Sequence, residues 1–162
     1  MIKAIMATDD QGGVSRGANM PWPKNSNDLQ WFKKNTLSQV VIMGSKTWED
    51  PFMPTPLKHR TNILITNKNK SYYPGADKYI NGDIVNEINN LEKEYINKDI
   101  FIIGGPEIIN QCFDLFKEFY LTRIYGNFNC EKFIDLDQIE KKMKLSEKIN
   151  SDETCHFEIW KK

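Results

Sequence analysis

The feature that most constrains the fold is a series of short, nearly continuous apolar runs separated by segments with helical spacing. The runs lie at residues 2–7, 40–43, 62–66 and 100–103. An unbroken apolar run indicates a strand that is covered on both faces, as in a parallel sheet. Parallel strands need crossover connections, which are usually helices. The alternation therefore predicts an α/β protein.

Helices are expected between these strands, at residues 29–37, 46–49, 84–96 and 107–116. The third has the clearest helical spacing of apolar residues, at Ile84, Ile88, Leu91 and Tyr95. Residues 118–124 and 156–161 alternate apolar and polar side chains, which predicts an antiparallel edge of the sheet. A chain of 162 residues with 40% hydrophobic content can bury one continuous core. We therefore expect a single domain over residues 1–162.

Two of the apolar runs end in glycine and lead directly into a helix. The segments are Gly104-Gly105-Pro106-Glu107 and Gly44-Ser45-Lys46-Thr47. Glycine lets a backbone approach a phosphate closely, and the N–H groups at the start of a helix favour an anion. Either segment alone is more often an ordinary tight turn, but the repetition favours a nucleotide site. Neither is a Walker A loop, because the upstream glycine of that motif is absent.

A third strand, at residues 62–66, runs into Asn67-Lys68-Asn69-Lys70. In an NAD-binding fold, an acidic residue at such a place binds the ribose hydroxyls. Basic and amide groups favour NADP instead. Taken singly, Lys68 and Lys70 are typical of a solvated loop.

An aspartate shares a helical face with two aromatic rings in the segment that begins at residue 28. Asp28 at position i lies on the side of Trp31 at i+3 and Phe32 at i+4. If the rings face the core, burial raises the pKa of the carboxyl unless donors or a cation hold it ionised. Such a group binds a ligand with paired N–H donors or handles a proton. The alternative is an ordinary first-turn acid, with Ser26 or Asn27 as the helix cap.

Charge and cysteine content argue against several classes of protein. Lys+Arg and Asp+Glu both number 22, and no long basic run suggests a nucleic-acid partner. The apolar N-terminal run stops at Asp9 and Asp10, too early for a signal peptide or a membrane span, so we expect a cytoplasmic protein with no membrane partner. Cys112, Cys130 and Cys155 are odd in number and widely spaced, which predicts reduced thiols and no metal site.

Together the motifs resemble dihydrofolate reductase. The segments that carry the resemblance are Met20-Pro21-Trp22, residues 28–33, residues 41–49, Leu57 to Arg60, residues 62–66, Ile103-Gly104-Gly105 and Tyr120-Leu121-Thr122. They keep the order and approximate spacing of the family over nearly the whole chain. The resemblance implies a mixed, mainly parallel eight-stranded sheet flanked by four helices. It also implies NADPH-dependent reduction of dihydrofolate to tetrahydrofolate, in support of one-carbon metabolism and thymidylate synthesis, with antifolate-type small molecules as further ligands.

The resemblance assigns residues to the site. Asp28 would orient the pterin and promote its protonation, with Trp22 and Thr122 as catalytic neighbours; Met20 and Trp22 would belong to a loop closing over the nicotinamide. Arg60 would fork onto the glutamate-tail carboxylate. The implied substrate-binding residues are Met6, Ala7, Asp28, Leu29, Phe32, Met53 or Phe52, Leu57, Arg60, Ile103 and Thr122. The implied cofactor-binding residues are Ala7, Met20, Gly44, Ser45, Lys46, Thr47, Ile65, Thr66, Asn67, Lys68, Ile103, Gly104, Gly105, Glu107, Ile108 and Ile109.

Four positions depart from the family pattern. Ser45 and Glu107 stand where many bacterial relatives carry arginines around the adenosine 2′-phosphate, and Ile109 stands where many have a tyrosine near the nicotinamide. The missing contacts are expected from Lys46, Thr66, Asn67 and Lys68. Glu131 stands where an aspartate is frequent, and it is expected to restrain the loop that carries Met20.

Two other functions fit part of the pattern. A pyrimidine reductase of the riboflavin pathway uses a similar sheet with NADPH, but it does not require Pro21-Trp22 and Asp28. A nucleotide-binding scaffold protein retains the Gly104-Gly105 turn and tolerates loss of the acid. The reductase is favoured because five residues occur together, namely Asp28, Trp22, Phe32, Arg60 and Thr122. Since no interface stripe is obvious, we expect a monomer.

Overall fold

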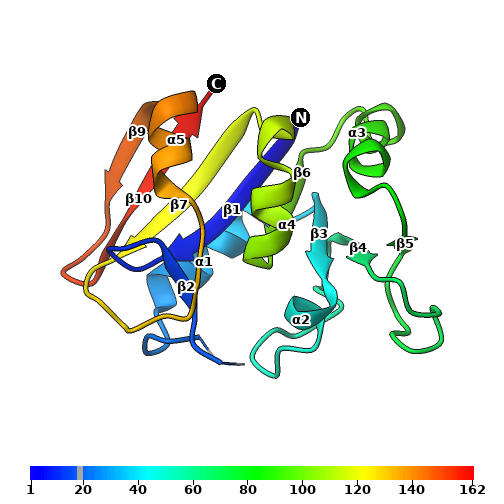
Figure 1. Cartoon of the computed structure of the whole chain (residues 1–162), viewed down its shortest axis with the longest axis horizontal. Helices are drawn as coiled ribbons and strands as arrows, with labels where there is room; N and C mark the ends of the chain where they lie inside the picture. The colour runs from blue at the N-terminus through cyan, green and yellow to red at the C-terminus, as the bar shows by residue number, and fades with distance from the viewer. Residues whose placement is uncertain (18–19) are drawn as a thin grey trace.

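A computed structural model describes residues 1–17 and 20–162 of the chain. Its main sheet has eight strands in the order β5-β4-β3-β6-β1-β7-β10-β9 (Figure 1). In chain order they are β1 (Ile2–Thr8), β3 (Val40–Gly44), β4 (Thr61–Ile65), β5 (Lys78–Ile80), β6 (Ile100–Gly104), β7 (Glu118–Ile124), β9 (Lys144–Asn150) and β10 (Cys155–Lys161). All neighbours from β5 to β7 are parallel, whereas β10 is antiparallel to both β7 and β9. The predicted mixed, mainly parallel eight-stranded sheet is confirmed.

Helices cover both faces of this sheet. Figure 1 shows α3 (Ile84–Glu94), α4 (Pro106–Gln111) and α5 (Leu136–Lys142) in front, with α1 (Ser26–Thr36) behind. A single turn, α2 (Ser45–Trp48), follows β3, and a 3-10 turn covers Phe113–Leu115. A small second sheet pairs β2 (Gly13–Ser15) with β8 (Lys132–Phe133). None of the helices in the described ranges is long and apolar enough to cross a membrane.

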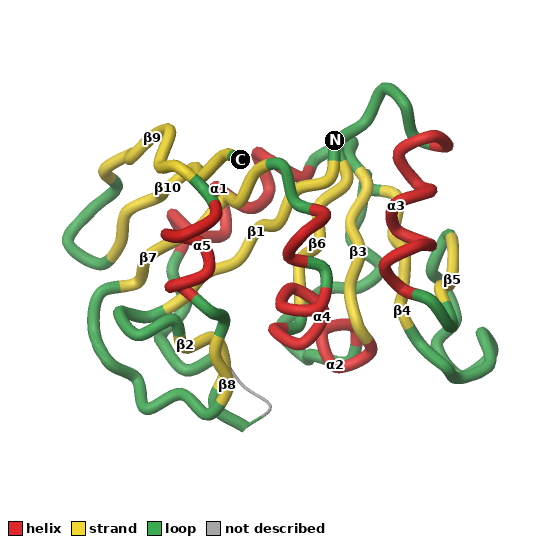
Figure 2. Tube along the Cα trace, turned by 45° about the horizontal axis from the view of Figure 1, so that its top comes forward, coloured by secondary structure: helices red, strands yellow, loops and turns green. Residues whose placement is uncertain are grey.

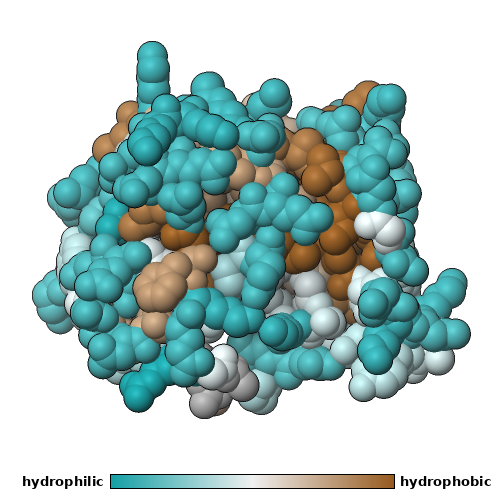
Figure 3. Space-filling view, viewed as in Figure 1, coloured by the Kyte–Doolittle hydropathy of each residue, from teal (hydrophilic) through white to brown (hydrophobic). Residues whose placement is uncertain are grey.

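Two hydrophobic cores follow from the alternation of side chains along each buried strand. In β1, Ile2 and Ala4 pack in the core under α3, α4 and α5, whereas Ile5 packs in the core under α1. On the α1 side, Trp31 stacks on Phe157 of β10 with ring centroids 4.4 Å apart and planes 4° from parallel. On the other side, Figure 3 shows apolar surface between α3 and α4.

Several elements differ from the expected boundaries. The first helix starts at Ser26, and its N-cap is Asn25, whose side chain accepts a hydrogen bond from the Asp28 backbone N–H. Neither Ser26 nor Asn27 is the cap. The expected helix at residues 107–116 is divided, because α4 ends at Gln111 and a 3-10 turn follows. The helix α5 and the strands β2, β5, β8 and β9 were not predicted, since β5 has three residues, β8 two, and β9 is almost wholly exposed.

Candidate active site

The candidate site lies at the carboxyl ends of β3 and β6, where the first turns of α2 and α4 lie side by side (Figure 2). Open α/β sheets usually bind ligands at this edge. Gly44 ends β3 and Gly104 ends β6, so the structure brings the two glycine turns together. Gly104 has φ +144°, and a Cβ there would lie 3.0 Å from the Thr47 hydroxyl. Only glycine fits this close approach of the two turns.

Asp28 fits both interpretations of its sequence position, as a first-turn acid of a helix and as a carboxyl group turned toward the core. It lies in the first turn of α1, and its backbone N–H donates to Asn25 Oδ1 at 3.1 Å. Its side chain is half-buried and forms a hydrogen bond with the hydroxyl of Thr122 on β7. Burial raises the pKa of the Asp28 carboxyl, and the Thr122 hydrogen bond only partly opposes that shift. Asp28 is therefore a carboxyl group disposed to hold a proton or to await a cationic or N–H-rich ligand.

Apolar residues surround Asp28 on this face of the sheet. The core under α1 contains six of the predicted residues, namely Ala7, Trp22, Phe32, Met53, Leu57 and Ile103. Leu29 is 43% exposed and so stands at the rim. Met53 packs against this core whereas Phe52 is 72% exposed, so Met53 is the one of the two that faces the site.

Two predicted residues lie away from the lining of the site, and one residue on the Asp28 face was not predicted. Met6 packs with the opposite core, under α4, as the period of two from Ala7 requires. Ile5 is buried on the Asp28 face and was missed, although the same alternation from Ala7 indicates it. Ile109 is 1% exposed and belongs to the core beneath α4, so its side chain supports the site rather than lining it.

Arg60 is positioned by three neighbours. Its Nε donates to the Thr36 hydroxyl at 3.2 Å, and one terminal nitrogen donates to the Lys58 carbonyl at 2.8 Å. Its guanidinium carbon lies 6.0 Å from the centroid of the Phe32 ring. Partial burial lowers the pKa of Arg60, but a guanidinium stays charged at any physiological pH. The group is thus a fixed cation at the edge of the apolar region.

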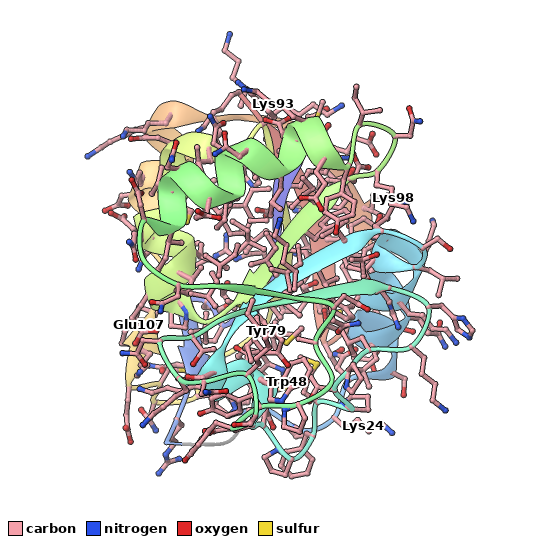
Figure 4. The ribbon with its side chains drawn as sticks, turned by 90° about the vertical axis from the view of Figure 1, so that its right-hand side faces the viewer. Lys24, Trp48, Tyr79, Lys93, Lys98 and Glu107 are labelled. Carbon is pink, nitrogen blue, oxygen red and sulfur yellow. The ribbon has the colours of Figure 1, made fainter. Side chains whose placement is uncertain are left out.

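A cavity of about 420 Å³ lies beside the turn at Gly44, whose neighbour Ser45 is part of its lining. It is lined by Ser45, Ile65, Thr66, Asn67, Lys68, Tyr73, Ile80, Asn81, Gly82 and Ile84. The isoleucines provide apolar surface for a flat ring, and the hydroxyl, amide and ammonium groups suit phosphate. Tyr73 was not predicted; its hydroxyl donates to Glu49, and its carbonyl accepts from Tyr79 at 2.5 Å. Tyr79 and Trp48, both labelled in Figure 4, pack against the core under α1.

The segment that leads toward Met20 and Trp22 is held by a buried aspartate. Asp9 is fully buried and accepts hydrogen bonds from the backbone N–H groups of Gln11, Gly13 and Phe128 at 2.9, 2.8 and 3.2 Å. Burial raises the pKa of Asp9, but these donors outweigh it and lower the pKa overall. The acid therefore stays ionised and ties the two loops together.

Glu131 and Trp22 complete this region. The Glu131 backbone N–H donates to the Ser15 carbonyl at 2.8 Å, which joins Glu131 to β2; the expected restraint of the loop that carries Met20 stays a prediction. Trp22 is 6% exposed and meets Phe128 edge to face at 6.0 Å. Its Nε1 is buried without a hydrogen-bond partner in the described part of the chain. Such a donor suits a ligand or an ordered water. Met20 is 41% exposed.

Comparisons with known proteins agree on one family. A family model described as dihydrofolate reductase matches residues 1–161. The dihydrofolate reductase of Bacillus subtilis (strain 168) is 30% identical over 154 residues, covering 94% of this chain and 87% of that protein. Dihydrofolate reductase type 8 of Escherichia coli is 28% identical over 165 residues, covering 99% of this chain and 96% of that one.

A solved structure is similar over almost its whole length. It is described as dihydrofolate reductase from Enterococcus faecalis complexed with NADP(H) and RAB-propyl. The similarity has a TM-score of 0.85 at 25% sequence identity, and it covers 99% of this chain and 95% of that chain.

Proposed function

The chain belongs to the dihydrofolate reductase family, and from that premise we propose how the residues of its site divide the work. The enzyme reduces 7,8-dihydrofolate to 5,6,7,8-tetrahydrofolate with NADPH, the reaction of EC 1.5.1.3. The family also makes it a binder of antifolate-type molecules. The half-buried Asp28 carboxyl beside Thr122 is the observation that carries the proposal for the chemistry.

Asp28 holds the pterin and promotes its protonation. An ionised carboxylate accepts two hydrogen bonds from the 2-amino and ring N–H groups of the pterin, which fixes the ring in the plane needed for transfer. The Thr122 hydroxyl, bonded to the same carboxyl, keeps it in one orientation. The raised pKa of Asp28 suits the second task, which is to promote protonation of the pterin nitrogen during reduction: the proton comes from water, and the carboxylate orients that water or stabilises a pterin tautomer.

Apolar residues exclude water around this acid. Phe32, Leu57 and Met53 would sandwich the bound substrate, with Ala7 and Ile103 beneath it. Removal of water strengthens the hydrogen bonds between the pterin and Asp28. Arg60, already fixed by Thr36 and Lys58, is the cation for the carboxylate of the glutamate tail.

The cofactor fits the residues at the two glycine turns. Bound NADPH supplies the hydride. Its adenosine would occupy the cavity lined by Ile65, Ile80 and Ile84, and its 2′-phosphate would meet Ser45, Thr66, Asn67 and Lys68. The close approach of Gly104 to Thr47 brings the two turns together, and their residues would hold the rest of the dinucleotide. The helices α2 and α4 have only four and six residues, so side-chain cations must supply most of the charge that binds the phosphates.

The test is the loss of NADPH absorbance when dihydrofolate is added to the purified protein. We expect turnover in the wild type and a fall in kcat of about a hundredfold to ten-thousandfold in Asp28→Asn, the usual loss for a general acid. NADPH binding should persist in the variant, because Asp28 lies outside the dinucleotide cavity. A variant that turns over at the wild-type rate would remove Asp28 from the chemistry. Turnover of the riboflavin-pathway pyrimidine with none of dihydrofolate would move the substrate assignment to that class.

We also propose that the enzyme works as a cytoplasmic monomer. Cys112, Cys130 and Cys155 are all free thiols, as expected of a reducing compartment. Burial raises the pKa of Cys112 to about 11, so that thiol is an unreactive part of the core. Light scattering at working concentration tests the oligomeric state, and a dimer mass would contradict the proposal.

A further inference from the structure

A lysine from the small second sheet reaches the edge of the candidate cofactor site. Lys132 lies on β8, and its Nζ is 2.6 Å from Glu107 Oε1 in the first turn of α4. A second contact holds β8 against α4, since Asn110 Nδ2 donates to the Phe133 carbonyl at 3.4 Å. Lys132 is therefore placed at the α4 end of the site although it is distant in sequence from both glycine turns.

Glu107, the partner of Lys132, lies just after the Gly104-Gly105 turn in the chain, with Pro106 between them. The second carboxylate oxygen of Glu107 is 3.4 Å from the place that a Cβ on Gly105 would occupy. The carboxylate also accepts a hydrogen bond from its own backbone N–H, and Lys132 is the main cause of the lowered pKa of Glu107. In Figure 4, Glu107 projects at the side of the sheet that carries α3 and α4. Glu107 thus stays ionised, with its carboxylate beside the backbone of Gly105.

A second lysine, Lys46, also lies near the Lys132–Glu107 pair. Lys46, in the turn after β3, is near enough to the Lys132–Glu107 pair for both charges to act on it: Lys132 lowers the pKa of Lys46, and Glu107 opposes that shift. Two ammonium groups repel each other unless an anion lies between them. Glu107 supplies one negative charge against two positive charges, so the group retains a net charge of +1. The arrangement suits a further anion.

We infer that Lys132, together with Lys46, binds the diphosphate of the dinucleotide, and that Glu107 is an internal counterion which competes with that diphosphate. This inference rests on the proposed function. The cation beside the first turn of α4 then comes from β8, since Lys132 pairs with Glu107 there. Because β8 pairs with β2, diphosphate binding also restrains residues 13–15, which lead toward Met20.

The inference is tested by direct titration of the purified protein with NADPH and with NADH, followed by tryptophan fluorescence or calorimetry. Both dinucleotides carry the diphosphate, but only NADPH carries the 2′-phosphate. Lys132→Gln should raise the Kd of both by about tenfold, because one charge-assisted contact is lost. The ratio of the two Kd values should not change. Lys68→Gln, at the 2′-phosphate side, should instead raise the Kd of NADPH alone.

Glu107→Gln gives the sharpest contrast. If Glu107 competes with the diphosphate, its removal should lower the Kd for both dinucleotides, opposite in sign to Lys132→Gln. An ion pair that serves stability alone would make the two variants alike, and that result would overturn the inference. Lys132→Arg should restore binding. Lys142→Gln, which removes a lysine from an exposed ion pair with Asp114 at 3.5 Å, controls for a general change of charge.

The outcomes separate this inference from the proposed function. If the wild type neither binds NADPH nor turns over dihydrofolate, the proposed function fails. If the wild type does both and Lys132→Gln binds both dinucleotides with unchanged Kd, only the role of Lys132 fails. Melting temperatures of the variants within a few degrees of the wild type are expected, since an exposed ion pair contributes little to stability.

Discussion

At the scale of single residues, the chemistry depends on one carboxyl group held in two ways. The Asp28 backbone is capped by Asn25, and its side chain turns toward Thr122 on β7. The capping hydrogen bond fixes where the helix begins and therefore which side chain of the first turn faces the sheet. A carboxyl group placed in this manner lowers the stability of the fold at neutral pH, because burial opposes its ionisation.

Asp28→Asn should therefore be more stable than the wild type at neutral pH while it loses activity. The raised pKa means that the folded protein binds this proton more tightly than the unfolded chain does. Stability of the wild type then falls as the pH rises from the unfolded value of 3.8 through the folded pKa, whereas asparagine has no such dependence. Urea denaturation at about pH 7 and about pH 4 measures the difference, which should shrink at the lower pH. A variant that is less stable at neutral pH contradicts this account.

Arg60→Lys should raise KM for dihydrofolate by about tenfold with a smaller change in kcat, since lysine keeps the charge but loses the fork. The hydrogen bonds of Arg60 to Thr36 and Lys58 set the guanidinium plane that the variant cannot reproduce. A dihydropterin without a glutamate tail is the matched substrate, and its KM should be unaffected. An equal rise for both substrates would show that Arg60 supports the pterin pocket instead.

At the scale of elements, the sequence predicts the strands that consist of apolar runs. It misses the short strands that are defined by pairing with a segment distant in the chain. Strands β1, β3, β4 and β6 are buried on both faces, so their composition alone indicates them. In contrast, β2 and β8 have three and two residues and are defined by pairing with each other. Their pairing brings Lys132 to Glu107, and no local pattern around either residue indicates that contact.

The loop that approaches Met20 depends on a glycine with no room for a side chain. A Cβ on Gly13 would lie 2.5 Å from Cys130 Sγ and 2.9 Å from Asp9 Oδ1. Gly13→Ala should destabilise the protein by about 2 kcal/mol, because the clash separates β2 from β8. Gly17→Ala is the matched control: φ is +62° and no described atom lies within 4 Å, so only the backbone strain of about 1 kcal/mol applies. Urea denaturation compares them, and equal losses would argue against the clash.

At the scale of the whole molecule, a charge network joins the strands at the end of the sheet where β1 and β7 begin. Lys3 Nζ is 2.9 Å from Glu118 and 2.9 Å from Asp99, with Lys3 and Glu118 both 9% exposed. Burial alone would lower the pKa of Lys3, but the hydrogen bonds that Lys3 donates to Glu118 and Asp99 raise it overall. Lys3 and Glu118 are register partners on neighbouring parallel strands, so the pair fixes how β1 lies on β7.

Glu118→Gln should cost about 2 kcal/mol at neutral pH, less than a fully broken buried pair because Asp99 remains. Burial raises the pKa of Glu118, but Lys3 and Lys161 outweigh it and lower the pKa overall. Its contribution is therefore present above the unfolded pKa of 4.5 and is lost as the pH falls through the folded pKa. The exposed pair Lys78–Glu94 is 2.8 Å apart, against 2.9 Å for Lys3–Glu118, so Glu94→Gln is the matched control and should cost under about 0.5 kcal/mol. Equal losses in the free energy of unfolding for Glu118→Gln and Glu94→Gln would mean that burial does not strengthen the Lys3–Glu118 pair.

The stacking of Trp31 on Phe157 has a consequence for how the enzyme is made. A ribosome delivers the chain from its N-terminus, so the helix that bears Asp28 emerges early. The strand that supports this helix, β10, is the last strand in the chain order. A nascent chain can thus carry every residue of the pterin pocket and still lack the surface that orients its acid. Catalytic competence should arise abruptly, when the final strand enters between β7 and β9, rather than growing as each element is synthesised.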